Sequence, residues 1–231
     1  MSDTLQFLPF LFVLVPFIFM GGIIALIIFL HKKSAAARAA RAREMTTAAA
    51  HLNWSFVPQS QLNFFPQHEQ YHLFSLGHTK EIRNLMHGER DGARVAVFDY
   101  MYVTGHGKSR SEATQTVVLL ESAQINLPFF SLRPENFMHR IAGAFGYQDI
   151  DFAHRPAFND RYLLRGSDET QIRWAFTNDV LAYYEVLPGL STDGGGQRLV
   201  CYRENVKVET AQLPAFVDWG VGMLKLFRHA W

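Results

Sequence analysis

The apolar positions of the chain begin with one unbroken run near the N-terminus. Residues Leu5 to Leu30 are 26 consecutive positions without a charged side chain. An α-helix rises about 1.5 Å per residue, so this run spans about 39 Å, more than the roughly 30 Å of hydrocarbon in a bilayer. The pattern therefore predicts a transmembrane helix that anchors the chain through residues 1–31.

A secretory signal peptide is the alternative for this run. Such a peptide has a positively charged start, an apolar stretch of about 7 to 15 residues and a cleavage site between small residues. Here the start, Met1 to Thr4, carries an acidic residue, and the apolar run is about twice too long. The Ala35–Ala37 run resembles a cleavage site but lies beyond Lys32 and Lys33. We therefore favour a retained membrane helix.

Basic residues follow the apolar run closely, whereas no Lys or Arg precedes it. They are Lys32, Lys33, Arg38, Arg41 and Arg43. Positively charged flanks remain in the cytoplasm, so we expect the N-terminus outside and the C-terminal domain in the cytoplasm of the cell. The single cysteine, Cys201, agrees with a reducing compartment because no second cysteine is present for an internal disulfide. The basic cluster either contacts anionic lipid headgroups or serves as a topology determinant alone.

The rest of the chain divides into a stalk and one domain. Residues 32–52 are rich in Ala and Arg, which favours a basic juxtamembrane helix or stalk. Residues 53–231 are long enough and apolar enough for a single domain with its own core. Residues 45–231 carry 17 Lys or Arg and 19 Asp or Glu. This near balance is a poor electrostatic match for nucleic acid, so we expect no nucleic-acid partner.

The first half of this domain has the alternation of β-strands. Arg94 to Val103 and Thr114 to Glu121 are dense in β-branched and aromatic residues, with a polar, glycine-rich loop at 105–111 between them. Tyr71 to Leu76 and Glu81 to Met86 are weaker strand candidates.

The second half alternates predicted helices with strands. Helices are expected over Pro134 to Phe145, over Glu169 to Phe176 after a cap at Ser167, and from a cap at Thr177 through Val186. Gly194 to Gly196 is expected to form a turn before a strand at 197–203. The last helix carries a stripe of Leu213, Phe216, Val217, Val221, Leu224 and Phe227. The fold class predicted is α+β: an N-terminal transmembrane helix followed by a cytoplasmic antiparallel sheet packed with helices.

One string in the domain has a catalytic pattern. His68-Glu69-Gln70-Tyr71-His72 fits H-E-x-x-H, which in zinc hydrolases places two imidazoles on one helical face with the Glu beside the metal-bound water. His78 follows at the spacing of a third zinc ligand. Pro66 and Gly77 flank the string closely, which disfavours the long helix that the motif needs. The alternative is a chance match of surface and strand histidines.

Three stretches resemble a group of bacterial membrane proteins. They are similar to the domain-of-unknown-function 3137 class at Val97–Tyr102 with Thr116–Val117, at Leu127–Glu135, and from Phe158–Leu164 through Asp168–Glu169 to Arg173–Phe176. The resemblance covers roughly residues 70 to 185. It implies a membrane helix before a cytoplasmic α+β domain, with no assigned catalytic residues.

Two functions remain open from the sequence. We favour a single-pass membrane protein whose cytoplasmic domain is a binding or scaffold module for an unknown protein or small ligand, without a cofactor. The alternative is a membrane-tethered zinc hydrolase, with Glu69 as the catalytic residue and His68, His72 and His78 as metal ligands. In either case the lipid bilayer is a partner of the chain.

Overall fold

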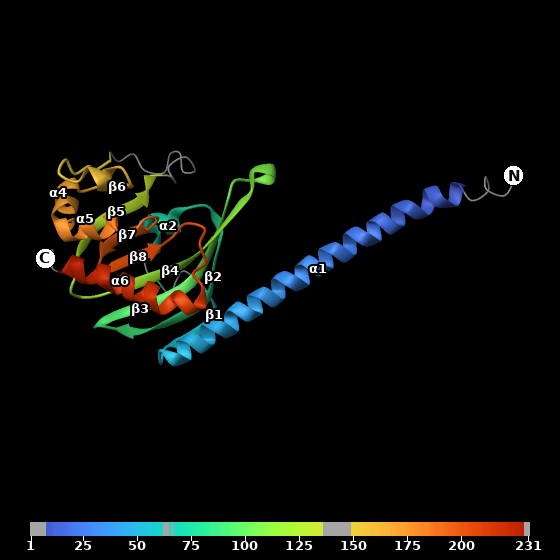
Figure 1. Cartoon of the computed structure of the whole chain (residues 1–231), viewed down its shortest axis with the longest axis horizontal. Helices are drawn as coiled ribbons and strands as arrows, with labels where there is room; N and C mark the ends of the chain where they lie inside the picture. The colour runs from blue at the N-terminus through green and yellow to red at the C-terminus, as the bar shows by residue number, and fades with distance from the viewer. Residues whose placement is uncertain (1–7, 62–64, 66, 136–148, 229–231) are drawn as a thin grey trace. The chain divides into compact units, whose positions relative to one another are not determined.

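The computed structural model describes residues 8–61, 65, 67–135 and 149–228, with side chains from residue 18 onward (Figure 1). The chain forms two compact units, Met1–Glu44 and Met45–Trp231, and each is described here by itself.

The first unit contains most of helix α1, Leu8–His51. Its side chains from Ile18 to Leu30 are exposed, with exposed fractions of 73% for Phe19 and 63% for Phe29. By its length and composition this helix is able to cross a membrane, which agrees with the predicted anchor. The helix ends in the second unit, where Met45 and Ala49 are buried. The compact domain thus begins within the segment expected to be a stalk.

Within the described residues, the second unit contains an eight-stranded antiparallel sheet in the order β1-β2-β3-β4-β8-β7-β5-β6. The strands are β1 Ser55–Ser60, β2 His78–Arg90, β3 Ala93–Thr104, β4 Ser111–Glu121, β5 Leu127–Pro134, β6 Tyr162–Gly166, β7 Ser191–Gly196 and β8 Arg198–Tyr202. Neighbouring strands pair antiparallel throughout. This confirms the α+β prediction.

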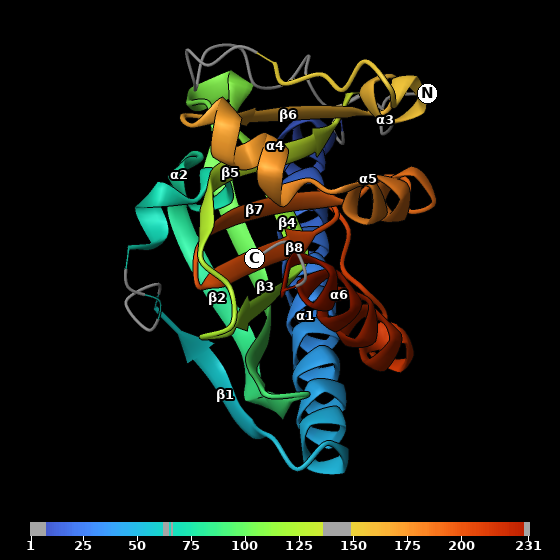
Figure 2. The same cartoon turned by 90° about the vertical axis from the view of Figure 1, so that its left-hand side faces the viewer.

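Helices pack on both faces of the sheet, and on the second face α2 covers only part of it (Figure 2). Besides the end of α1, the helical segments described in this unit are η2 His68–Gln70, α2 His72–Ser75, η3 Gly107–Ser109, α3 Pro156–Asn159, α4 Glu169–Ala175, α5 Asn178–Glu185, η5 Thr210–Gln212 and α6 Leu213–Arg228. The larger core lies on the side of α3 to α6, and α2 belongs to a second, aromatic-rich core on the opposite face. Because each face carries a core, the strands bury side chains on alternate sides.

The two strongest predicted strands are confirmed as one long hairpin. β3 pairs with β4 from Arg94↔Glu121 to Thr104↔Ser111 without a register shift. The final helix is also confirmed, because the predicted apolar stripe of α6 is buried in the larger core. The spacing of apolar residues therefore predicted both the β3–β4 hairpin and helix α6 correctly.

The glycine run 194–196 was expected to be a turn before a strand, but Gly194 and Gly195 lie within β7, and the turn into β8 falls at Gly196 and Gln197. A Cβ at Gly194 would lie 2.2 Å from the Phe130 ring, and one at Gly195 would lie 2.3 Å from the Phe129 ring. The two glycines therefore let aromatic rings of β5 cross over the neighbouring strand. Such close approach to a strand is a packing use of glycine that turn propensity does not reveal.

Three other local predictions also differ from the structure. Tyr71–Leu76 is not a strand, because residues 72–75 form α2. Asp168, and not Ser167, caps α4 by accepting a hydrogen bond from the Gln171 amide. Pro134 ends β5 and does not begin a helix, and the expected helix from 136 onward lies outside the described residues. The Thr177 cap of α5 is confirmed, with its side chain accepting from the Val180 amide.

Candidate functional site

The H-E-x-x-H string does not form the single helix that the zinc motif needs. His68 and Glu69 belong to η2, the backbone of Tyr71 is extended (φ −93°, ψ 129°), and His72 begins α2. Because Tyr71 is extended, His68 and His72 are not one helical turn apart, and their imidazoles do not lie on one helical face. Glu69 is exposed, whereas His72 is buried.

The expected third ligand lies in a different setting. His78 is in β2, and its ring stacks on that of His106 with the centroids 4.7 Å apart. Among the residues that the structure describes, no group of three His, Cys, Asp or Glu side chains is placed to hold a metal ion. The geometry thus gives the zinc hypothesis no support.

His72 instead belongs to a buried, electropositive environment. Burial, together with the smaller effect of the nearby guanidinium groups of Arg133 and Arg165, lowers its pKa to about 3. Burial and the neighbouring guanidinium groups both disfavour the positively charged imidazolium, so the imidazole stays neutral at physiological pH. A neutral, enclosed histidine is suited to packing on this face.

Replacing His72 with Gln is expected to weaken the decrease in the free energy of unfolding that occurs as the pH falls below neutrality. The unfolded chain protonates this histidine below about pH 6.5, whereas the folded domain does so only near pH 3. Between these values the unfolded state binds more protons, so the free energy of unfolding falls by about 1.4 kcal/mol per pH unit as the pH decreases. Denaturant titrations between about pH 7 and pH 5 measure this slope. The exposed-site control His106→Gln should keep it, and a His72→Gln slope equal to the native one contradicts the assignment.

A buried polar network lies beside His72. It consists of Arg133 of β5, Asp193 of β7, Tyr202 of β8 and Glu204. Arg133 donates to Asp193 at 3.1 Å, to Glu204 at 3.1 Å and to the Tyr202 hydroxyl. Asp193 is fully buried and accepts from the Leu73 amide of α2 at 2.8 Å. Burial raises the pKa of Asp193, and Arg133 opposes that rise. The network joins three strands to α2, which is a structural role.

A groove crosses β1 to β4 on the sheet face that carries the aromatic-rich core. Its floor is formed by Val57, Leu85, Ala96 and Leu119, one from each strand, together with Phe65. Its volume of about 570 Å³ falls in the range of about 300 to 1,000 Å³ typical of small-molecule sites. An apolar floor of this size marks the groove as the candidate binding site of the domain.

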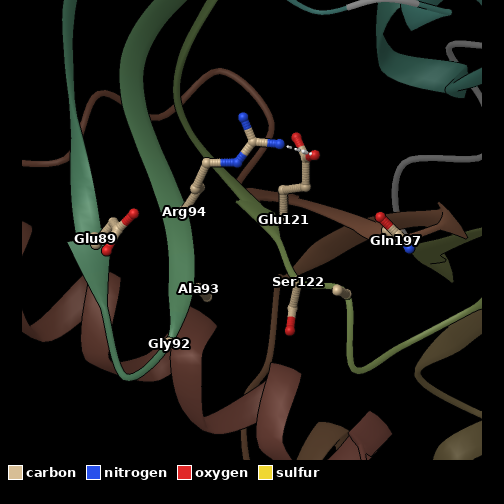
Figure 3. Close-up of a pocket in the computed structure, with 8 residues that line it drawn as sticks. Glu89, Gly92, Ala93, Arg94, Glu121, Ser122 and Gln197 are labelled. Carbon is tan, nitrogen blue, oxygen red and sulfur yellow. Dashed lines mark hydrogen bonds and ion pairs between the residues drawn. The ribbon is translucent and has the colours of Figure 1, made fainter.

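One end of the groove is charged. Arg94 of β3 and Glu121 of β4 are cross-strand partners and form an ion pair, and their side chains point toward one another (Figure 3). Arg198 donates from Nε to the same carboxylate at 3.2 Å. The Arg198 guanidinium also lies 5.2 Å from the centre of the Phe65 ring. Glu89 lines the same end, and Glu89, Arg94 and Glu121 also line a smaller hollow of about 210 Å³ beside Gln197.

The predicted lipid-contact residues lie on α1, apart from this groove in sequence. Lys32, Lys33, Arg38 and Arg43 are exposed, and Arg41 is partly buried. Arg43 Nε donates to the Ala39 carbonyl at 3.3 Å, as side chains on an exposed helix often do. Four of the five basic side chains on α1 are therefore exposed.

The groove was not found from the sequence. Leu85, Ala96 and Leu119 occupy alternate strand positions, which is also the pattern of ordinary core residues. The one available signal was that the two strongest strands place opposite charges, Arg94 and Glu121, at the same end of a hairpin. Sequence spacing alone does not show that a concave surface lies next to that pair.

The fold and its groove define a helix-tethered α+β domain. No protein-family model matches the chain, and no curated protein matches it significantly. Among solved structures, it is similar to the crystal structure of the mycobacterial trehalose monomycolate transport factor A, TtfA, with a TM-score of 0.54 and 14% sequence identity. The match covers 82% of this chain and 93% of that one. At this identity the likeness shows a common fold, and the resemblance to the 3137 class stays a prediction.

Proposed function

We propose that the protein is a single-pass membrane protein whose C-terminal domain is a cytoplasmic binding module. The observation that carries the proposal is the exposed apolar surface of α1, where Ile18, Phe19 and Phe29 are each more than 60% exposed. A contiguous apolar surface of this kind requires lipid or protein to cover it. The basic residues that follow favour the orientation with the N-terminus outside.

The basic cluster also supports contact with the membrane surface. Lys and Arg side chains next to a membrane helix attract anionic lipid headgroups by about 1 kcal/mol each. Lys32, Lys33 and Arg38 are exposed on α1 within ten residues of the apolar run. We propose that anionic headgroups are the first partners of this segment.

The binding role is supported by the groove and by the fold. The groove offers an apolar floor with charged groups at one end, which is the usual composition of a ligand site. The similar structure is that of a transport factor. We propose a role as a transport factor for this chain as well, without assigning it that protein's substrate.

A reporter fused after Trp231 is expected to behave as cytoplasmic. The positive flank of α1 keeps its C-terminal side in the cytoplasm. Neutralising Lys32, Lys33, Arg38, Arg41 and Arg43 should therefore increase the fraction of molecules whose C-terminal domain lies outside. A phosphatase that is active only outside the cytoplasm, and a fluorescent protein that folds inside it, measure both orientations. Neutralising Lys108 and Arg110 of the domain is the matched control and should leave the ratio unchanged. High phosphatase activity in the unaltered protein contradicts the orientation.

A further inference from the structure

The Arg and Glu side chains of the groove lie at one end. Its floor consists mainly of aliphatic side chains and one ring, with His87 beside Ala96 and Ser60 also in the lining, and Leu85, Ala96 and Leu119 are each less than 10% exposed. The ionic groups gather at the β3–β4 end, around Glu121. A ligand that matches this pattern is apolar along its length and charged or strongly polar at one end.

The backbone around the groove disfavours an extended peptide as that ligand. β2, β3 and β4 each pair with strands on both sides, so their N–H and C=O groups are used within the sheet. A peptide lying on this face would bury its own amide groups against Val57, Leu85 and Leu119 without partners. Each buried, unsatisfied amide costs about 1 to 3 kcal/mol, whereas an aliphatic chain has no such groups to satisfy.

The ionic groups at the polar end suit a charged head group. Glu121 accepts from both Arg94 and Arg198, so two guanidinium groups share one carboxylate. The Arg94 side chain is 71% exposed and keeps donors available to a ligand. Glu89 is the cross-strand neighbour of Arg94 on the same rim and carries the opposite charge. We assign the head group to Arg94 because it is the more exposed of the two guanidinium groups, and the opposite charge of Glu89 makes that residue the matched test of the sign.

We propose that the groove binds the single aliphatic chain of an acidic amphiphile, with its head group at Arg94. The chain lies along Val57, Leu85, Ala96 and Leu119, and Phe65 closes one side. The assignment names the ligand of the binding module proposed above and rests on it, because a membrane is the ordinary source of such amphiphiles.

The test uses the full-length protein in nanodiscs of neutral phospholipid. The probe is dodecanoate with a terminal diazirine, and mass spectrometry locates its adducts after illumination. Adducts are expected on groove residues as well as on α1, which contacts the probe in the bilayer and serves as an internal control. Ala96→Phe fills the groove and should reduce groove adducts at least about tenfold while those on α1 stay unchanged.

The charge of the head group is tested by a matched pair of rim variants. Arg94→Gln should reduce groove adducts about tenfold, because a hydrogen bond to a charged group is lost. Glu89→Gln removes the opposite charge at the same rim and should not reduce them. The same diazirine chain with a trimethylammonium head should label the groove at least about tenfold less than the acid does. Thermal unfolding of each variant confirms that the domain is folded.

Several outcomes overturn the inference. Adducts confined to α1 show that the groove binds no aliphatic chain. Groove adducts that persist in folded Ala96→Phe, in which the groove is filled, show that the labelling does not come from a chain bound inside it. Loss of labelling in Glu89→Gln but not in Arg94→Gln reverses the head-group sign. If Ala96→Phe does not fold, the rim variants and the two probes still decide. Release of the protein from membranes by salt alone would contradict the proposed function, and the groove adducts are scored independently of that result.

Discussion

Replacing Asp193 with Ala is expected to destabilise the domain by about 3 to 5 kcal/mol, because it removes one of the two carboxylates that pair with the buried Arg133 and leaves that charge only partly compensated. Asp193 is fully buried and pairs with Arg133, which is itself only 7% exposed. The substitution also removes the acceptor of the Leu73 amide, so α2 loses one of its attachments to the sheet. Denaturant unfolding of the full chain in detergent, followed by tryptophan fluorescence, measures the change, since all four tryptophans lie outside residues 1–44.

Two variants separate the causes of this loss. Asp193→Asn keeps an oxygen for the Leu73 amide but removes the charge, so its cost should fall below that of Asp193→Ala. Glu169→Ala breaks an exposed ion pair with Arg173 on α4 and should change the free energy of unfolding by about 0.5 kcal/mol or less. An Asp193→Ala effect as small as that of Glu169→Ala contradicts a structural role for the network.

Elements governed by local periodicity were predictable from the sequence. β3 and β4 have unbroken runs of β-branched and aromatic residues, and their register follows from the alternation between two buried faces. The stripe of α6 repeats with helical spacing over four turns. In each case the residues that define the element also bury it, so local and tertiary preferences agree.

Elements that depend on distant partners were not predictable. The glycines of β7 are explained by the rings of Phe129 and Phe130, more than sixty residues earlier in the chain. Residues 72–75 look extended by composition, yet they form α2 and are held by Asp193, which is 120 positions from Leu73. Turn and strand propensities describe a residue's own backbone and carry no information about such partners.

The candidate site depends even more on residues that are far apart in the sequence. The H-E-x-x-H string was conspicuous because its spacing matches a known chemistry, but the backbone at Tyr71 separates its two histidines. The groove was inconspicuous because its floor combines single residues from four strands and one loop, none of which differs from core positions. Only the assembled sheet brings these side chains onto one concave surface.

Replacing Phe227 with Ala is expected to lower the free energy of unfolding by about 3 to 5 kcal/mol, because it opens a cavity in the larger core. The Phe227 ring is fully buried and lies 5.5 Å from that of Phe176 and 5.8 Å from that of Phe130, centroid to centroid. It therefore connects α6 both to the sheet and to the segment between α4 and α5. The same denaturant unfolding experiment measures the loss.

The matched control removes an aromatic side chain that packs on little. Trp174 of α4 is 75% exposed, so Trp174→Ala should change the free energy of unfolding by about 0.5 kcal/mol or less. The contrast matters because the sequence of α6 also allows an amphipathic helix that lies on a membrane surface. If Phe227→Ala leaves the unfolding free energy unchanged while reducing binding of the domain to vesicles, α6 belongs to that surface and not to the core. A loss several times larger than that of Trp174→Ala places the helix in the cooperative unit, as its buried stripe predicts.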